Sequence, residues 1–594
     1  MVLKFFSLLI LGTDFSLRNV AATPISCKCA PEDNCWPSTA DWENFNTTVS
    51  GKLIATQPVA LSCYPGANYD EKACAAVLTG WSNSSYVSEN PVGLDFPINI
   101  TCPPINITET NVTGSCSIGT NPRYAVNVTA VEDISATLEF AQKKNLRVAI
   151  KSTGHDILGR NDGYGSLEVW LRYFRQGISF QSNFQSSTGC AGSNWTGAAM
   201  KLSGGYMWRE VYAVAKEHGV VVVGGGSPTV SSTGGWMQGG GHGPASRTFG
   251  LGADQVLEAE IVLANGTVIT ANACQNQDIY FAIRGGGPGT YGVVTSTTIK
   301  AWPQVNATFQ TLQIAPSSGN TSSFLDALAT LHQLIPDLMD AGYSGYGNWQ
   351  VDGQSTVFGN FTTGYTHGIS IFNKTEQEAK DIFNTAREKL SGFKDTLYIS
   401  EAYTTYPDYW SFYYATSGEY LPVGLMAAAG SRLLDRKSLS DCDAVRKTLA
   451  TLAGEPGQYT IISVSMVSSG QVSADASDVY SGVLPAWRTA YIHNTVSRII
   501  GSSVGPEEKQ AMHDDITFNK IGAMKALAPD TGAYMNEADF NEPDYQIDYY
   551  GKNYEKFRLT KAKYDPSNLF YCPQCVGSSE WKSDEIGRLC AVKA

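Results

Sequence analysis

At 594 residues the chain is longer than one hydrophobic core usually organises, so its length predicts two or three domains. Hydrophobic residues make up 43% and charged residues 16% of the chain, a composition that excludes wholesale disorder. The formal net charge of −13, from 42 basic against 55 acidic residues, argues against nucleic acid or an anionic membrane as the main partner.

The first 22 residues are typical of a secretory signal peptide. Lys4 is followed by a short apolar run, and the small residues at 20–22 offer a cleavage site before Thr23. Later apolar runs fall short of the roughly 18–20 residues that a membrane-spanning helix needs. We therefore expect a secreted, extracellular protein without membrane insertion.

Residues 23–120 form a Cys-rich N-terminal segment. Seven of the 13 cysteines lie between Cys27 and Cys116, and three more lie between Cys572 and Cys590. In an exported protein this distribution predicts disulfide bonds. Because the number of cysteines is odd, at least one thiol stays free or pairs outside the chain.

Sequons of the type N-x-Ser/Thr are far denser than a cytosolic protein would need. In an exported chain they predict N-glycans. They begin at Asn46, Asn83, Asn99, Asn106, Asn111, Asn127, Asn194, Asn265, Asn306, Asn320, Asn360 and Asn373.

From residue 124 onward the pattern becomes that of alternating strands and helices. A strand at 124–128 precedes a helix with apolar residues at 134, 138 and 141, and a buried strand follows at 147–150. A helix near 208–218 leads into a second buried strand at 220–223. Asn265-Gly266 lies between β-rich runs at 257–263 and 267–270, which predicts a hairpin.

The region from about 303 to 540 has a different character. Helical patterns at 373–390 and 438–452 and a β-rich run at 459–467 predict a second domain. Five aromatic residues between 403 and 414 fit either a ligand-binding cleft or a core at near-helical spacing, and we favour the core; they are Tyr403, Tyr406, Tyr409, Trp410 and Tyr414.

Three glycine-rich segments carry the candidate chemistry. His155 follows the strand at 147–150 and stands next to Gly154, where it is either a polar loop residue or an ordered nucleophile. Nine of the 20 residues at 224–243 are glycine, and a third such segment covers 284–295. Successive backbone N–H groups in such loops bind anions such as a diphosphate. The segment at 224–243 is not a P-loop, because no Gly-Lys-Ser/Thr follows it.

These segments resemble, in order, the motifs of the berberine-bridge-enzyme-like branch of the vanillyl-alcohol-oxidase superfamily. The motifs are Ser152-Thr-Gly-His-Asp156 with Gly159-Arg160, Gly224-Gly-Gly-Ser-Pro-Thr-Val230, Gly239-Gly-Gly-His-Gly243, Gly250-Leu-Gly-Ala-Asp254, Arg284-Gly-Gly-Gly287 and Tyr564-Asp-Pro-Ser-Asn568. The N-terminal run Cys35-Trp-Pro37, Trp42, Leu53-Ile-Ala-Thr56 and Cys63 is similar, more narrowly, to secreted fungal isoamyl alcohol oxidase-like FAD-linked oxidases.

The resemblance implies an α+β fold. Residues 121–302 would form a PCMH-type FAD-binding domain of two subdomains, with the segment 23–120 packed on it. Residues 303–540 would form an α/β substrate domain whose antiparallel sheet lies over the flavin. Residues 541–594 would return to the FAD domain and end in a tail.

The same resemblance implies FAD bound covalently through the 8α-methyl group to His155. Ser227 occupies the position from which many relatives make a second, cysteinyl link, so we expect one covalent bond only. No metal is expected, because Cys572-x-x-Cys575 lacks a second pair at zinc spacing. The other residues expected to contact the cofactor are Lys151, Ser152, Thr153, Gly154, Asp156, Gly159, Arg160, Gly226, Thr229, Val230, Gly234, Gly235, Gly240, Gly241, His242, Asp254, Gly292, Val294, Asn553 and Asn568.

Tyr549 matches the place of a catalytic tyrosine in relatives, with Tyr550 as the alternative. Its phenol would need a lowered pKa to serve as a base, through a cation such as Arg488 or Arg498. The expected reaction is oxidation of a CH–OH group of an alcohol, carbohydrate or secondary metabolite, with O2 reduced to H2O2 by a glycosylated monomer. The alternatives are a flavin dehydrogenase with another electron acceptor and a flavin-retaining binding protein with little turnover.

Overall fold

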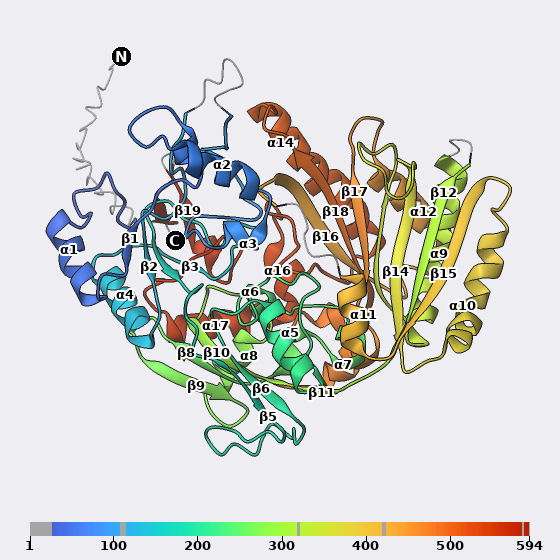
Figure 1. Ribbon diagram of the computed structural model, residues 1–594, viewed down its shortest axis with the longest axis horizontal. Coiled ribbons are helices and arrows are strands. Elements are labelled where there is room, and N and C mark those ends of the chain that lie inside the picture. The colour runs from blue at the N-terminus through green and yellow to red at the C-terminus, as the bar shows by residue number, and fades with distance from the viewer. Residues whose placement is uncertain (1–26, 107–114, 318–320, 418–422, 585–586, 593–594) are drawn as a thin grey trace, which may run out of the picture.

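The computed structural model describes residues 27–106, 115–317, 321–417, 423–584 and 587–592. It has an α+β fold built on three main sheets, as the sequence predicts (Figure 1). The expected signal peptide at 1–22 lies outside the described residues. None of the helices that the structure describes has both the length and the apolar character needed to cross a membrane.

The first sheet has four strands in the order β1 (Leu53–Ala55), β2 (Tyr124–Asn127), β4 (Leu167–Trp170) and β3 (Val148–Lys151). Strands β2 and β3 both pair in parallel with β4, and β1 pairs antiparallel with β2. Helix α4 (Val131–Lys143) connects β2 to β3 and buries Ile134, Leu138 and Ala141. The strand–helix–strand unit predicted from the apolar spacing is therefore present.

The second sheet has five strands that pair antiparallel throughout. Their order is β5 (Ile178–Gln181), β6 (Ala199–Ser203), β10 (Val293–Lys300), β8 (Val256–Val262) and β9 (Val268–Asn272). The predicted hairpin at Asn265-Gly266 joins β8 to β9, with Gly266 at φ +77°. Around this sheet lie α5 (Trp208–Glu217), β7 (Val220–Val221), α6 (Gly235–Gln238), α7 (Ser246–Phe249), α8 (Gln277–Ile283) and β11 (Trp302–Pro303).

The third sheet has seven antiparallel strands and stands on the right of Figure 1. Their order is β15 (Leu397–Tyr406), β12 (Ala307–Pro316), β14 (Gly364–Phe372), β13 (Ser344–Gln350), β17 (Ile461–Met466), β18 (Ala490–Ile500) and β16 (Met426–Asp435). One face packs in a single apolar core against α9 (Thr321–Asp340), α10 (Glu376–Ser391), α12 (Cys442–Ala453) and α15 (Ile521–Leu527).

Strand β18 shows why the opposite face of this sheet is polar. Ile492, Val496 and Ile500 belong to the core under the helices. Because side chains alternate between the faces of a strand, His493, Thr495 and Ser497 point away from that core. Thr495 and Ser497 line a cavity on that side.

The segments at the two ends of the chain pack on the first two sheets. Helices α1 (Thr39–Thr48), α2 (Glu71–Gly80) and α3 (Ser84–Val87) belong to the N-terminal segment, and α16 (Tyr545–Tyr550) and α17 (Tyr554–Tyr564) to the C-terminal one. Disulfides join Cys27–Cys590, Cys29–Cys35, Cys63–Cys74, Cys102–Cys116, Cys190–Cys274 and Cys572–Cys575. Cys442 is the odd thiol that the count predicts.

The aromatic residues near 410 are mostly core. Helix α11 (Tyr409–Thr416) buries Tyr409 and Trp410 against the glycine-rich part of the chain, where the Trp410 indole donates to the carbonyl of Val220. Tyr414 is exposed. The core interpretation therefore holds for Tyr409 and Trp410, and Tyr406 packs against the same cluster.

Candidate active site

A cavity of about 510 Å³ lies where the three sheets approach one another. This volume falls within the roughly 300–1,000 Å³ typical of ligand pockets. Its walls come from the loop after β3, the glycine-rich segment 227–238, the turn before β10, strand β18 and the segment 534–537. The cavity therefore collects the glycine-rich motifs and one polar face of the seven-stranded sheet.

His155 lies in the wall of this cavity. Its Nε2 atom is 2.7 Å from Thr229 Oγ1, 3.1 Å from Ser84 Oγ and 3.1 Å from Asp95 Oδ2. In the part of the chain that the structure describes, Nδ1 has no hydrogen-bond partner. Burial lowers the pKa of His155, so the imidazole is held neutral at ordinary pH.

The residues before His155 also border the cavity. Lys151 donates from Nζ to the carbonyls of Asn90 and Pro91, at 2.6 and 3.0 Å, and burial lowers the pKa of Lys151 to about 8. The Ser152 hydroxyl donates to the carbonyl of Gly204. Lys151, Ser152, Thr153 and Gly154 all line the cavity, as expected for cofactor contacts.

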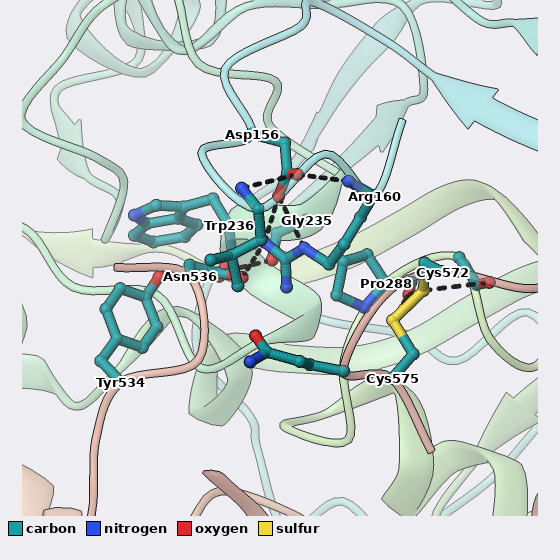
Figure 2. A network of polar contacts seen from close by, with 12 residues as sticks. Asp156, Arg160, Gly235, Trp236, Pro288, Tyr534, Asn536, Cys572 and Cys575 are labelled. Atoms are coloured by element: carbon teal, nitrogen blue, oxygen red, sulfur yellow. Dashed lines mark hydrogen bonds and ion pairs between the residues drawn. A yellow bond between two sulfur atoms is a disulfide. The ribbon is translucent and has the colours of Figure 1, made fainter. Parts of the chain in front are cut away.

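Asp156 and Arg160 form an ion pair in the cavity wall. Figure 2 shows the Arg160 guanidinium between Asp156 and Asn536, and it donates to Asn536 Oδ1 at 2.9 Å. The Asn536 amide in turn donates to the carbonyls of Gly235 and Trp236. This chain of contacts fixes the segment 534–537 to both the His155 loop and the glycine-rich segment.

The glycine-rich segments provide much of the remaining wall. Ser227, Val230, Gly234 and Gly235 line the cavity, as do Gly292 and Val294 on the opposite side. Gly226 is not in the wall, but a Cβ added there would meet no atom within 4 Å. Thr229 contributes through its bond to His155. The Ser227 hydroxyl lies 3.3 Å from that of Thr229, so oxygen rather than sulfur occupies this place.

Several residues expected at the cofactor lie away from the cavity and have structural roles. Asp254 is buried in an ion pair with Arg488, at 2.8 Å. Asn553 donates to the carbonyls of Gly482 and Val483. Three glycines and one asparagine adopt positive φ in turns outside the cavity wall: Gly159, Gly240, Gly241 and Asn568.

The structure also places Tyr549 and Tyr550 outside the cavity wall. The Tyr549 hydroxyl donates to the carbonyl of Asp539 at 2.6 Å, and the Tyr550 hydroxyl to that of Gln574 at 2.9 Å. Their side chains are 2% and 1% exposed, and burial raises the pKa of both phenols. The two arginines suggested as cations for lowering the pKa of these phenols are engaged elsewhere: Arg488 pairs with Asp254 and Arg498 with Asp515. Both hydroxyls thus bond to backbone carbonyls, and neither tyrosine lines the cavity.

Glu537 is the carboxylate that the cavity presents instead. It lies between two histidines, with Oε1 3.2 Å from His242 Nε2 and Oε2 3.6 Å from His493 Nδ1. Tyr346 holds the other nitrogen of His242 at 3.2 Å. Burial alone would raise the pKa of Glu537, but the charge and hydrogen bond of His242 and the charge of His493 lower it to about 2.

Most of this cluster was not predicted from the sequence. His242 was expected at the cofactor because of its glycine motif, whereas Glu537 and His493 lie in no recognisable motif. The alternation of β18 was the available signal, because it places His493 on the same face as Thr495 and Ser497. The position of Glu537 depends on the Asn536 contacts, which no local pattern predicts.

Comparisons with known proteins agree with this geometry. Residues 122–272 match the family model of a FAD binding domain, and residues 533–577 match the model described as berberine and berberine like. FAD-linked oxidoreductase hmp9 of Hypomyces subiculosus is 46% identical over 95% of this chain and 90% of that protein. FAD-linked oxidoreductase apf9 of Gibberella fujikuroi is 38% identical over 97% of this chain and 98% of that protein. The crystal structure of VAO-type flavoprotein MtVAO713 from Myceliophthora thermophila C1 has a TM-score of 0.93 and 43% identity, over 96% of this chain and all of that one.

The chain belongs to the VAO and berberine-bridge-like family of FAD-linked oxidoreductases. It is therefore an oxidoreductase with FAD as its cofactor. In this FAD-linked oxidoreductase the FAD-binding match includes His155 and its loop, and the berberine-like match includes Glu537. Both matched regions meet in the cavity wall.

The residues of the cavity fit FAD. His155 offers an imidazole nitrogen without a partner among the described residues, and glycines at 234, 235 and 292 leave parts of the wall without side chains. A cofactor of this size needs close approach to backbone, and these glycines permit it.

Proposed function

We propose that this FAD-linked oxidoreductase is a secreted oxidase of CH–OH groups in an alcohol, carbohydrate or secondary metabolite, with O2 as the electron acceptor and H2O2 as a product. FAD, when bound, supplies the hydride acceptor. The observation that carries the proposal is the Glu537 carboxylate in the same cavity wall as His155. One side of the cavity thus offers a cofactor anchor and another a proton acceptor.

Glu537 is placed to accept a hydrogen bond from a substrate hydroxyl and to take its proton as the substrate is oxidised. The neighbouring histidines lower its pKa, so the carboxylate is ionised at ordinary pH; the proposed role rests on its position in the cavity wall. His242 and His493 fix the carboxylate from two sides. Thr495 and Ser497 on β18 and Tyr534 add hydroxyl groups to the same wall, which suits a polar substrate.

We propose a single covalent bond between FAD and His155. The imidazole lines the cavity with Nε2 occupied, which leaves Nδ1 for the flavin. Ser227 supports the absence of a second bond, because a hydroxyl forms no thioether. We further propose N-glycans on the sequons, export through the segment 1–22 and a monomeric enzyme.

The function is tested by anaerobic reduction of the enzyme with a panel of alcohols and sugars in a stopped-flow instrument, followed by mixing with O2. Rapid reoxidation with one H2O2 per flavin is the expected result. Slow reoxidation by O2 together with fast reoxidation by a quinone would identify a dehydrogenase. Reduction by no member of a broad panel, in a protein that retains flavin, would favour a binding protein.

The position of the base is tested by two variants in the same assay. Glu537→Gln keeps the shape of the side chain but accepts no proton, so we expect flavin reduction to slow by about 10²–10⁴-fold. Tyr549→Phe should leave reduction unchanged, because its hydroxyl is bonded to a carbonyl outside the cavity. If flavin reduction were instead slow in Tyr549→Phe and unchanged in Glu537→Gln, the base would be the tyrosine.

A further inference from the structure

The N-terminal segment supplies the polar groups that hold His155. Ser84 in α3 and Asp95 in the following loop approach Nε2 from one side, and Thr229 approaches from the glycine-rich segment. The Ser84 hydroxyl donates to Asp95 Oδ2 at 2.7 Å. Because the Ser84 hydroxyl gives its proton to Asp95, its oxygen can only accept from His155, so the proton at this contact is carried by Nε2.

Asp95 is fully buried, with a side chain 0% exposed. Its other oxygen, Oδ1, has no partner within the described part of the chain. Among the described ion pairs of Asp95, the histidine is the sole one. The buried carboxylate accepts from the Ser84 hydroxyl and lies 3.1 Å from Nε2 of His155, so Ser84 links it to the imidazole.

The hydrogen-bond arrangement selects one tautomer of His155. A neutral imidazole carries its proton on one nitrogen and a lone pair on the other. With the proton on Nε2, bonded to the Ser84 hydroxyl that donates to Asp95, the lone pair is on Nδ1, which has no partner among the described residues. The nitrogen available for bonding to the cofactor is therefore also the nucleophilic one.

The backbone locks the two segments together at this point. The Asp95 N–H donates to the carbonyl of Gly154 at 3.0 Å, and the Gly424 N–H donates to the carbonyl of Asp95 at 2.7 Å. Gly154 has φ +90°, and a Cβ there would lie 2.7 Å from the carbonyl oxygen of Gly93. The N-terminal segment thus lies directly against the His155 loop, and Gly154 is needed for that approach.

We propose that Asp95 is the positioning residue for covalent flavin attachment: it fixes the Nε2–H tautomer of His155 and accepts the Nε2 proton when Nδ1 bonds to the 8α-carbon of FAD. The inference rests on the proposed covalent attachment. In the overall step one C–H bond of the 8α-methyl group and the Nε2–H bond break and one C–N bond forms. The two electrons and two protons released reduce molecular oxygen to H2O2. Burial raises the pKa of Asp95, against the charge of His155, which makes the carboxylate a better proton acceptor.

The test compares Asp95→Asn with the unaltered enzyme. Each purified protein is incubated in air with excess FAD, samples are precipitated with acid at intervals, and the flavin that stays with the protein is measured by absorbance and in-gel fluorescence. We expect the asparagine to slow attachment by about 10²-fold, because it accepts no proton. Dialysable FAD should still bind, since the glycine-rich segments are unchanged.

Glu89→Gln is the matched control. It makes the same change in the same segment, but Glu89 pairs with Arg172 and not with His155. Attachment in Asp95→Asn at the rate of this control would overturn the role of Asp95. Absence of acid-stable flavin from the unaltered enzyme, or its persistence in His155→Ala, would instead overturn the covalent attachment itself.

Ser84→Ala provides a second test if Asp95→Asn does not fold. It removes the hydroxyl that orients Asp95 and leaves the sequon at Asn83 intact, because Ser85 supplies the required hydroxyl residue. We expect slower attachment with unchanged FAD binding and an unchanged unfolding temperature. An attachment rate equal to that of Glu89→Gln would count against the proposal.

Discussion

Ser227 places an oxygen atom where a second covalent bond to FAD, beside the proposed one through His155, would need sulfur. Its side chain lines the cavity, and its hydroxyl lies 3.3 Å from Thr229 Oγ1, which in turn lies 2.7 Å from His155 Nε2. A sulfur atom at this position would therefore be close to the anchor. The serine hydroxyl has too little nucleophilic character to replace it.

Ser227→Cys should introduce a second attachment point. In a His155→Ala background we expect this thiol to bind FAD covalently, because the cysteine is then the nucleophile beside the flavin. The measurement is the acid-stable flavin of the double variant against that of His155→Ala alone. Complete loss of flavin from both proteins on acid treatment would show that Ser227 lies out of reach of the isoalloxazine.

At the scale of the elements, the seven-stranded sheet and its helices bury three histidines. Burial lowers the pKa of His332 on α9 and of His493 on β18 to about 4, and that of His367 on β14 to about 3. An unfolded histidine takes up its proton near pH 6.5. Between about pH 6.5 and 4 the unfolded chain thus binds more protons than the folded chain, and stability falls as the pH drops through this window.

His332→Leu should weaken this dependence. A histidine with a folded pKa near 4 lowers the free energy of unfolding by about 2 kcal/mol when the pH falls from 7 to 5. The free energy of unfolding of the leucine variant should therefore fall by about 2 kcal/mol less than that of the unaltered enzyme over this interval. Denaturant titrations at the two pH values measure the difference. His218→Gln alters an exposed histidine and should behave like the unaltered enzyme. An unchanged pH dependence in His332→Leu would mean that His332 titrates normally.

Elements with a clear period were predictable from the sequence, and contacts across the chain were not. The unit β2–α4–β3 follows from the spacing of Ile134, Leu138 and Ala141, and the β8–β9 hairpin from Asn265-Gly266. The order of the seven-stranded sheet depends on pairings between strands up to about a hundred residues apart, such as β12 with β15, and local patterns do not encode them.

The same distinction, between local patterns and contacts across the chain, holds for the residues of the candidate site. The loop of His155 and the glycine-rich segments were identified because their motifs are continuous in sequence. Asp95 contacts His155 and Glu537 lines the cavity, and the sequence predicted neither place, because each depends on non-local bonds, to Gly154 and through Asn536 respectively. Tyr549 and Tyr550 were placed by motif alone, and their hydroxyls bond to carbonyls away from the cavity.

At the scale of the whole molecule, a disulfide joins the two ends of the described chain. Cys27 and Cys590 are 563 residues apart in sequence, and the Lys28 N–H donates to the carbonyl of Leu589 beside them. The N-terminal segment therefore closes on the C-terminal strand β20 (Leu589–Ala591). A disulfide that closes so long a loop strongly limits the conformations of the unfolded chain.

Cys27→Ser combined with Cys590→Ser should destabilise the protein by about 2–5 kcal/mol. The measurement is the thermal unfolding midpoint of the purified protein, with and without this pair of substitutions. Cys442→Ser, at the free thiol, is the control and should leave the midpoint in place. Equal midpoints for the unaltered enzyme, the double variant and Cys442→Ser would show that the disulfide between Cys27 and Cys590 contributes little to stability.

The contact between Asp95 and His155 has a consequence for how the enzyme matures. Asp95 lies between the disulfides Cys63–Cys74 and Cys102–Cys116, and it reaches His155 only when its segment has docked. If attachment depends on Asp95 as proposed, the permanent bond to the flavin is made late, after oxidative folding. Acid-stable yellow colour in a purified molecule would then indicate that its amino-terminal region had been correctly assembled.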